Sequence, residues 1–247
     1  MSAQLSFDEK TMPLRPKLAQ TQALPSYIRG HRKRLRERFA LGGADAIPDY
    51  ELLELILFRA MPQKDVKPMA RSLLEQFGCF SQVIAAPAQR LKEVSGIGDS
   101  AVCELKIIEA AMHRLAKSQV MRRHVISSWD DLLSYCRTVM AYRETEQFRV
   151  LFLDAKNHLI ADEALAEGTV DHVPVYPREI IKRALELNAS ALILVHNHPS
   201  GDPTPSDSDV SMTKLIGEAA RSLSITLHDH LIIGKKSETS FRASGLL

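Results

Sequence analysis

The stretch Ala191-Leu-Ile-Leu-Val195 runs directly into His196-Asn197-His198, and a loop rich in Pro, Gly and Ser continues from there to Asp209. The apolar run is typical of a buried strand, and alternate residues of a strand point to the same face. His196 and His198 therefore share a face, and Asn197 lies on the other. Two neutral imidazoles and one carboxylate are the ligands of a catalytic zinc site, which keeps an open position. The stretch predicts one Zn²⁺ per chain, bound by His196, His198 and Asp209.

The overall composition is that of an ordinary globular protein. The 247 residues are 45% hydrophobic and 25% charged, with a formal net charge of +2, so charge alone indicates no partner. No apolar stretch approaches the length of a membrane span, and the N-terminus lacks the apolar core of a signal peptide. Cys79, Cys103 and Cys136 are far apart and odd in number, which indicates reduced thiols. We expect a cytoplasmic protein without membrane contact.

The pattern of apolar residues divides the chain into two halves. Residues 1–27 are polar and aperiodic, which predicts a flexible tail. Helical periodicity over residues 28–118 predicts a small all-helical domain. After about residue 120, helical and strand patterns alternate without a strict βαβ repeat, so residues 125–247 predict an α/β sandwich around a mixed sheet. The expected fold class is thus α+β.

Some element ends can be assigned to single residues. Asp49 is expected to cap a helix over residues 51–58, and Ser128 is expected to cap the helix that begins at the following Trp. Near the C-terminus, Ile225–Leu227 and Leu231–Ile233 are rich in β-branched and aliphatic residues. They predict two separate strands.

A hydrolytic zinc site also needs a general base and a donor for the developing oxyanion. The carboxylates that could serve as the base are Glu144, Glu146, Glu163 and Glu167, and the residues by themselves do not decide among them. Ser206 precedes Asp209 by three residues, so both lie on the same side of a helical first turn. Its hydroxyl could stabilise an oxyanion, but Ser at this position would also cap a helix whatever the chemistry.

Other interpretations of these residues stay open. A serine hydrolase that uses Ser200 or Ser206 would need a Gly-x-Ser-x-Gly elbow, and the chain has none. His228-Asp229-His230 is a second His-x-His segment, which could bind a second metal. We favour a hydrogen-bonded structural role for it.

The spacing Glu…His-x-His-x10-Asp, with Ser three residues before the Asp, resembles the motif of the JAB/MPN (JAMM) metallopeptidases. The chain resembles the RadC branch of that superfamily in its strings His196–Asp202, Pro205-Ser206, Asp229–Gly234, Gly168-Thr169, Tyr176–Ile180 and Ser240-Phe241…Gly245. This similarity extends from about residue 28 to the end. It implies a JAB/MPN fold for residues 125–247 and a zinc ion on His196, His198 and Asp209.

The same resemblance implies roles for two further residues and a class of reaction. Glu146 corresponds to the upstream glutamate that acts as the base, and Ser206 to the oxyanion partner. The implied reaction is hydrolysis of peptide or isopeptide bonds. Asn197 departs from the Ser or Thr that deubiquitinating members usually have between the two histidines, and this departure leaves the substrate open.

The helical half carries two features of nucleic-acid-binding proteins. Leu91–Gly98, followed by a helix, resembles a helix-hairpin-helix motif, in which a Gly-x-Gly turn and helical amides approach a phosphate. A tight turn between two packed helices explains it equally well, and Asp99 would compete with a phosphate. Arg29–Arg38 contains six Arg or Lys residues and one Glu, a run that could bind phosphates or form a solvated helix face. The candidate DNA contacts are Arg32, Lys33, Arg34, Arg36, Gly96 and Gly98.

Two functions from different classes fit these patterns. One is a zinc-dependent JAMM-type hydrolase with a protein or peptide substrate and with DNA association through the helical half. The other is a DNA-binding repair or recombination accessory protein whose metal site is not catalytic. A metal-dependent nuclease is disfavoured, because magnesium sites use carboxylate-rich shells. The oligomeric state is left open.

Overall fold

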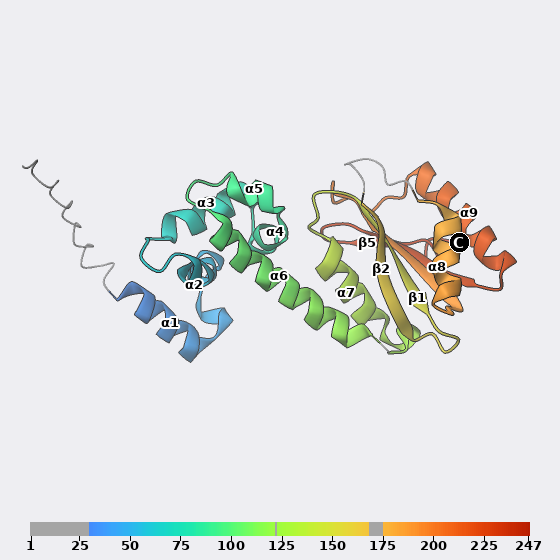
Figure 1. Ribbon diagram of the computed structural model, residues 1–247, viewed down its shortest axis with the longest axis horizontal. Coiled ribbons are helices and arrows are strands. Elements are labelled where there is room, and N and C mark those ends of the chain that lie inside the picture. Colours follow the sequence, from blue (N-terminus) through green and yellow to red (C-terminus); the bar gives the residue numbers. More distant parts are fainter. Residues whose placement is uncertain (1–29, 122, 168–174) are drawn as a thin grey trace, which may run out of the picture.

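The computed structural model describes residues 30–121, 123–167 and 175–247. Within these residues, an all-helical half is followed by an α/β half, and the long helix α6 (Asp99–Val120) runs from one to the other (Figure 1). This arrangement confirms the predicted fold class. The predicted tail lies outside the described residues. No helix in the described ranges is long and apolar enough to cross a membrane.

The helical half encloses a hydrophobic core of its own. Its elements are α1 (His31–Gly42), η1 (Ala44–Ala46), α2 (Asp49–Ala60), α3 (Lys67–Phe77), α4 (Phe80–Ala85), α5 (Ala88–Lys92) and the first part of α6. Leu53 and Leu57 are spaced i, i+4 on α2, so they lie on one face of that helix. Both are fully buried against Leu73, Leu91 and Leu105 from the surrounding helices. This core is separate from the two that flank the sheet.

The α/β half is built on a five-stranded mixed sheet with the strand order β2-β1-β3-β4-β5. The strands are β1 (Gln147–Leu153), β2 (Leu159–Glu167), β3 (Ala191–Asn197), β4 (Thr226–Ile233) and β5 (Glu238–Ser240). β3 and β4 are parallel, and the other neighbouring pairs are antiparallel. β3 lies at the centre of the sheet, and all its residues are buried.

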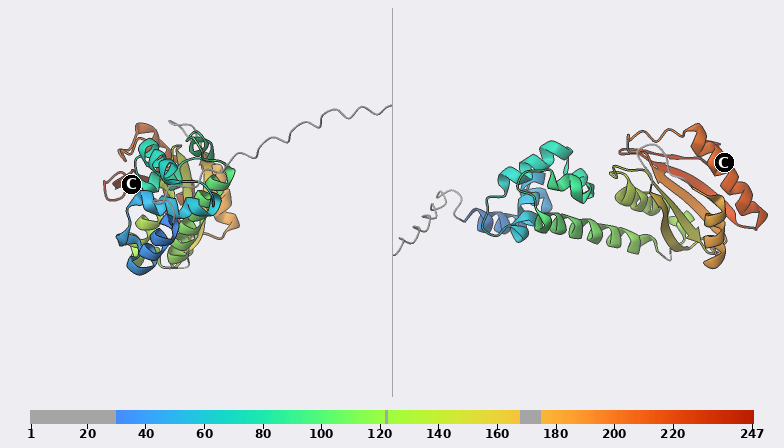
Figure 2. Two further views of the ribbon diagram at one scale, coloured as in Figure 1. Left: turned by 90° about the vertical axis from the view of Figure 1, so that its left-hand side faces the viewer. Right: turned by 45° about the horizontal axis from the view of Figure 1, so that its top comes forward.

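Helices cover both faces of this sheet (Figure 2). On one face, η2 (Val125–Ser128) and α7 (Trp129–Met140) contribute to a core that includes Ile193 and Val195 of β3. On the other face, α8 (Pro177–Glu186) and α9 (Asp207–Ser222) pack against Leu192 and Leu194. A strand buried on both faces is apolar along its whole length rather than at alternate positions. The predicted α/β sandwich is therefore confirmed.

Two expectations about element ends were wrong, and a third is confirmed in part. Asp49 is the first residue of α2 rather than its cap, and Pro48 occupies the cap position without a side-chain bond. Ser128 does occupy the cap position of α7, but its side chain accepts no capping hydrogen bond. The two short strands expected near the C-terminus are one strand, β4. Its polar middle stays in the sheet because those side chains are hydrogen-bonded to neighbouring elements.

Candidate metal centre

The three predicted metal ligands converge where β3 ends. His196 belongs to β3, His198 follows it directly, and Asp209 lies in the first turn of α9. The Nε2 atoms of the two histidines are 3.0 Å apart. Asp209 places Oδ1 3.3 Å from Nε2 of His196 and Oδ2 3.6 Å from Nε2 of His198. Because the candidate ligand atoms all lie within 4.8 Å of one another, one ion could contact all three residues.

A capping box at the start of α9 holds Asp209 in this position. The Oγ atom of Ser206 accepts a hydrogen bond from the backbone N–H of Asp209 at 3.2 Å. In return, Oδ2 of Asp209 accepts from the backbone N–H of Ser206 at 2.8 Å and from its hydroxyl at 2.6 Å. Two helix-terminal N–H groups gain partners in this way. The hydroxyl proton of Ser206 is thus donated to Asp209, and its role towards an oxyanion stays a prediction.

A chain of hydrogen bonds determines which nitrogen of His196 faces the other ligands. Thr213 donates its single hydroxyl proton to the backbone carbonyl of Asp209 at 2.6 Å, so it accepts from Nδ1–H of His230 at 2.6 Å. Nε2 of His230 then has no proton and accepts from Nδ1–H of His196 at 2.8 Å. The network therefore assigns a free lone pair to Nε2 of His196.

The same reasoning applies to His198. Its Nδ1 donates to the backbone carbonyl of Asp202 at 2.8 Å, which leaves a lone pair on Nε2 of the neutral ring. Two Nε2 lone pairs 3.0 Å apart repel each other unless a proton or a cation lies between them. The geometry fits a divalent cation, since both imidazoles and the carboxylate direct their electron pairs to one point.

The protonation equilibria also suit a cation. Burial lowers the pKa of His196 to about 4, even though the charge of Asp209 opposes this shift. Burial raises the pKa of Asp209, but the adjacent rings of His198 and His196 and the hydrogen bonds from Ser206 outweigh it and hold that pKa well below its usual range. At neutral pH the site therefore holds a neutral His196 and an ionised Asp209. The side chain of His196 is 1% exposed and that of His198 is 19% exposed, so solvent reaches the site on the side of His198.

The charge of Glu146 acts on one of the candidate metal ligands, His198. β1 and β3 are antiparallel with Phe148 opposite His196, and continuing that register by two residues puts Glu146 opposite His198. The adjacent carboxylate of Asp209 is the main cause that raises the pKa of His198, and the charge of Glu146 adds to it.

Two of the other candidates are engaged elsewhere. Glu144 forms an ion pair with Arg90 of α5 at 3.2 Å. Glu163 lies within β2 and makes a two-pronged contact with Arg183 of α8, with N–O distances of 2.7 and 2.8 Å. The side chain of Glu167 lies outside the described residues. The arrangement therefore favours Glu146 as the base, in agreement with the resemblance, although its catalytic role stays a prediction.

The second His-x-His segment does not form a metal site. In the part of the chain that the structure describes, His196, His198 and Asp209 are the one group with metal-ligand geometry. His230 is fully buried and hydrogen-bonded to His196, whereas His228 contacts Oδ1 of Asn157 at 2.6 Å. Both histidines of this segment are therefore hydrogen-bonded to neighbouring side chains, as the favoured interpretation expected.

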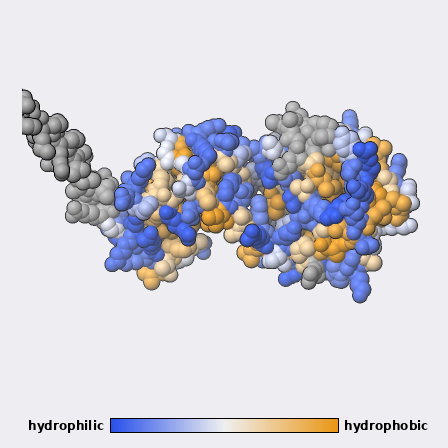
Figure 3. Space-filling view, in the orientation of Figure 1, coloured by the Kyte–Doolittle hydropathy of each residue, from blue (hydrophilic) through white to orange (hydrophobic). Residues whose placement is uncertain are grey.

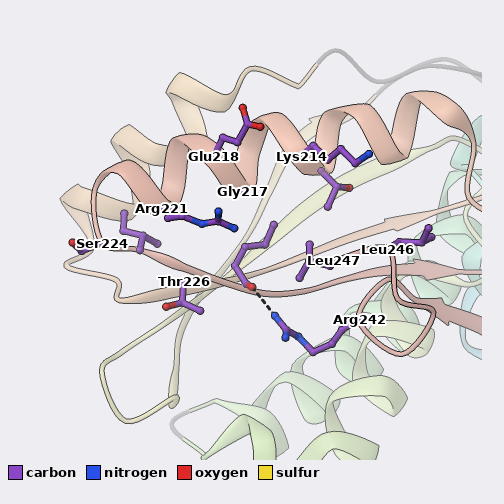
Figure 4. A pocket seen from close by; sticks show the side chains of 12 residues that line it. Lys214, Gly217, Glu218, Arg221, Ser224, Thr226, Arg242, Leu246 and Leu247 are labelled. Carbon is purple, nitrogen blue, oxygen red and sulfur yellow. Dashed lines mark hydrogen bonds between the residues drawn. The ribbon is translucent and has the colours of Figure 1, made fainter.

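A pocket next to α9 is not part of the metal centre. It has a volume of about 560 Å³ and lies between α9, β4 and the last residues of the chain, where Arg221, Arg242 and Leu247 contribute to its lining (Figure 4). Its lining includes Thr213 but none of the three metal ligands. The candidate metal site is thus the cluster of His196, His198 and Asp209 at the end of β3, and not this cavity.

The structure assigns internal contacts to part of the basic run on α1. Arg32 donates to the backbone carbonyls of Met61 and Lys64, both at 2.6 Å, and its guanidinium lies 4.4 Å from the ring centroid of Phe58. It satisfies carbonyl groups at and beyond the end of α2. Arg38 of α1 forms an ion pair with Glu51 of α2. Lys33 is exposed and lies 3.8 Å from Glu37, so fewer charges remain for a phosphate than the sequence indicates.

The remaining candidate contacts lie in other parts of the helical half. The basic run lies on α1, whereas the glycine turn lies between α5 and α6, and these helices are labelled at different places in the helical half (Figure 1). The surface of the helical half shows hydrophobic residues among the hydrophilic ones (Figure 3). Gly96 has a φ of +88° and sits so close to Met69 that a Cβ there would lie 2.8 Å from its sulfur. Arg34 and Arg36 of α1 are exposed.

At Gly98, in contrast, a Cβ would meet nothing within 4 Å. This residue precedes α6, whose first residue Asp99 forms an ion pair with Lys92 at 2.5 Å. The helix start is therefore open to solvent, and Lys92 offsets the charge that would compete with a phosphate there.

Comparisons with known proteins agree with this architecture. The family model described as RadC-like JAB domain matches residues 126–246, and the model described as UPF0758 N-terminal matches residues 30–103. A UPF0758 protein of Ruegeria pomeroyi is 68% identical over 224 residues, which are 91% of this chain and 100% of that protein. A UPF0758 protein of Rhodobacter capsulatus is 69% identical over 213 residues, 86% of this chain and 100% of the relative.

Proposed function

The chain belongs to the UPF0758 family and carries its RadC-like JAB domain, and from this premise we propose that it is a zinc-dependent hydrolase of peptide or isopeptide bonds, of the JAMM type. The observation that carries the proposal is the convergence of His196, His198 and Asp209, with Glu146 across the strand register from His198. Three protein ligands with solvent access on one side are the arrangement of a catalytic rather than a structural zinc.

The residues of the site would divide the work as follows. Nε2 of His196, Nε2 of His198 and the carboxylate of Asp209 would hold the ion. When bound, zinc polarises a carbonyl group and lowers the pKa of water in its open position to about 7. Glu146 would accept the proton of the attacking water and return it to the departing amine, so that the C–N bond breaks as the amine is protonated. Ser206 would donate a hydrogen bond to the oxyanion, at the expense of its bond to Asp209.

The test joins metal analysis to a screen of peptides and isopeptide-linked peptides. We expect about one zinc ion per chain in the purified protein. Glu146→Gln keeps the size of the side chain and removes the base, so it should retain zinc and lower the rate by about 10²- to 10⁴-fold. Glu144→Gln, two residues away, is the matched control and should leave the rate unchanged. Absence of zinc, or full activity of Glu146→Gln, would contradict the proposal.

DNA binding through the helical half is the second proposal, in which the metal site is not catalytic. It is supported by the open turn at Gly98 in front of α6 and by the exposed Lys33 and Arg36 on α1. Binding to duplex or branched DNA should weaken steeply with salt. Lys33→Glu combined with Arg36→Glu should weaken it further, whereas Glu37→Gln should not. Binding that is insensitive to salt, or unaffected by the double substitution, would exclude it.

A further inference from the structure

Asn197 lies between the two histidine ligands and is buried, with 1% of its surface exposed. Its side-chain amide bonds to the backbone ahead of β1. Oδ1 accepts a hydrogen bond from the N–H of Gln147 at 2.9 Å, and Nδ2 donates to the carbonyl of Thr145 at 3.1 Å. The residue between these two bonded residues is Glu146. One side chain therefore holds the backbone on both sides of the candidate base.

The chemistry of the amide explains why Asn suits this position. The Gln147 N–H can only donate and the Thr145 carbonyl can only accept, so the two contacts together determine the orientation of the amide. An Asp side chain supplies acceptors alone, and a Ser side chain is shorter with a single hydroxyl. Asn197 is also held in place itself, because its backbone belongs to the central strand β3. The amide is thus a rigid bridge from the metal-binding strand to the segment that carries Glu146.

Glu146 lies directly before the first residue of β1. The β1–β3 ladder ends with the pair Phe148 and His196, and the β1–β2 ladder ends with the pair Gln147 and Glu167. Residues beyond the last ladder pair fray unless other groups bind them. The two bonds from Asn197 tie the residues on both sides of Glu146 to β3.

We propose that Asn197 is a positioning residue that holds the Glu146 segment opposite the metal ligands. Its catalytic consequence rests on the proposed hydrolase function. The bridge itself does not, because it is a property of the fold. The residue that distinguishes this chain from the usual deubiquitinating motif would then act on the base rather than on the substrate.

The first arm of the test needs no substrate. In the zinc-loaded full-length protein, ¹⁵N NMR measures amide exchange at Gln147 and the backbone order parameter at Glu146. In Asn197→Ser we expect at least tenfold faster exchange at Gln147 and an order parameter that falls from the rigid range of about 0.85 towards 0.6. Leu132→Ala removes buried packing from α7 without touching the amide, so it should leave both quantities at their wild-type values.

The second arm measures catalysis with the metal content held constant. Asn197→Ser should keep zinc, because all three ligands remain, and should lower kcat by about 10- to 100-fold with KM unchanged, since a displaced base loses part of its contribution. Combined with Glu146→Gln, it should lower kcat no further than Glu146→Gln alone. Additive losses in the double variant, or unchanged exchange and order in the first arm, would overturn the proposal.

A third variant covers the case in which Asn197→Ser does not fold. Asn197→Asp keeps an acceptor for the Gln147 N–H and loses the donor to Thr145, so Gln147 should stay protected while the order parameter at Glu146 falls. Equal rigidity of Glu146 in this variant would overturn the bridge. If the wild-type protein cleaves no substrate, the proposed function fails, and the NMR arm still decides whether Asn197 orders the Glu146 segment.

Discussion

Two His-x-His segments lie on neighbouring parallel strands of one sheet, and they have different fates. At the end of β3, His196 and His198 face each other with Nε2 atoms 3.0 Å apart, and Asp209 completes the candidate ligand set. On β4, His230 is hydrogen-bonded to His196 behind that set. His228 lines a pocket with Trp129 and Ile193 on the α7 side of the sheet. The same residue pattern therefore yields a candidate metal site once and structural contacts once.

A bulge in β4 accounts for the difference. The register between β3 and β4 skips one residue, so that Leu192 pairs with Leu227 but Ile193 pairs with Asp229. An extra residue in one strand reverses the side-chain alternation beyond it. His228 and His230 therefore lie on opposite faces and cannot bind one ion. The comparison shows that His-x-His predicts a shared metal only where the strand stays regular and a third ligand follows.

The largest expected effect is a difference in zinc content between variants of the two His-x-His segments. Without His196 or Asp209 only two protein ligands remain, so His196→Ala and Asp209→Ala should lose stoichiometric zinc. His228→Ala should keep about one ion per chain, because His228 lies on the other face of the sheet. Metal analysis after gel filtration measures this. Zinc loss in His228→Ala together with retention in His196→Ala would reverse the assignment.

His230 should give a smaller loss of zinc affinity. His230→Phe removes the acceptor that orients Nδ1–H of His196, and loss of such a supporting contact weakens metal binding by about 10- to 100-fold. Competition with a chelator measures the affinity. Thr213→Val removes the far end of the same chain and should weaken binding by less. Unchanged affinity in His230→Phe would show that the network does not orient His196.

The third prediction concerns the helix that completes the first segment. Ser206→Ala removes a capping hydroxyl from α9, which should lower the free energy of unfolding of the metal-free protein by about 1 kcal/mol. Ser208→Ala, an exposed residue in the same turn, is the control and should have little effect. Chemical denaturation compares the two variants. Equal stability of both would mean that the cap contributes nothing measurable.

The smallest effect is the pH dependence that His228 contributes. Burial, together with the charge of Arg242, lowers the pKa of His228. The folded state therefore resists protonation more than the unfolded state does. The stability that this provides is present above the unfolded pKa of about 6.5 and is lost as pH falls below it. Unfolding measured between pH 7 and pH 5 should show a shallower loss in His228→Gln. An unchanged slope would place His228 in an environment like that of the unfolded chain.

Much of the fold and of the ligand set could be predicted because it depends on neighbours in sequence. The apolar run 191–195 predicts a buried strand, and its extension places His196 and His198 on one face. Ser206 and Asp209 lie three residues apart, which is one turn of a helix, so their capping contact follows from helical geometry. The side-chain caps expected from Asp49 and Ser128 are absent, because capping depends on the direction in which the chain enters the helix.

The sequence by itself determined the candidate metal ligands, the α+β class and the family resemblance. Only the tertiary structure decided which glutamate lies opposite His198 in the strand register, why His228 and His230 separate, and which backbone groups Asn197 binds. Strand alternation and the helical repeat operate over a few residues, so they are legible in the sequence. The β1–β3 register, the bulge in β4 and the bridge from Asn197 to the Glu146 segment join residues 34 to 52 positions apart. Such contacts depend on how strands pair, and no local period specifies that pairing.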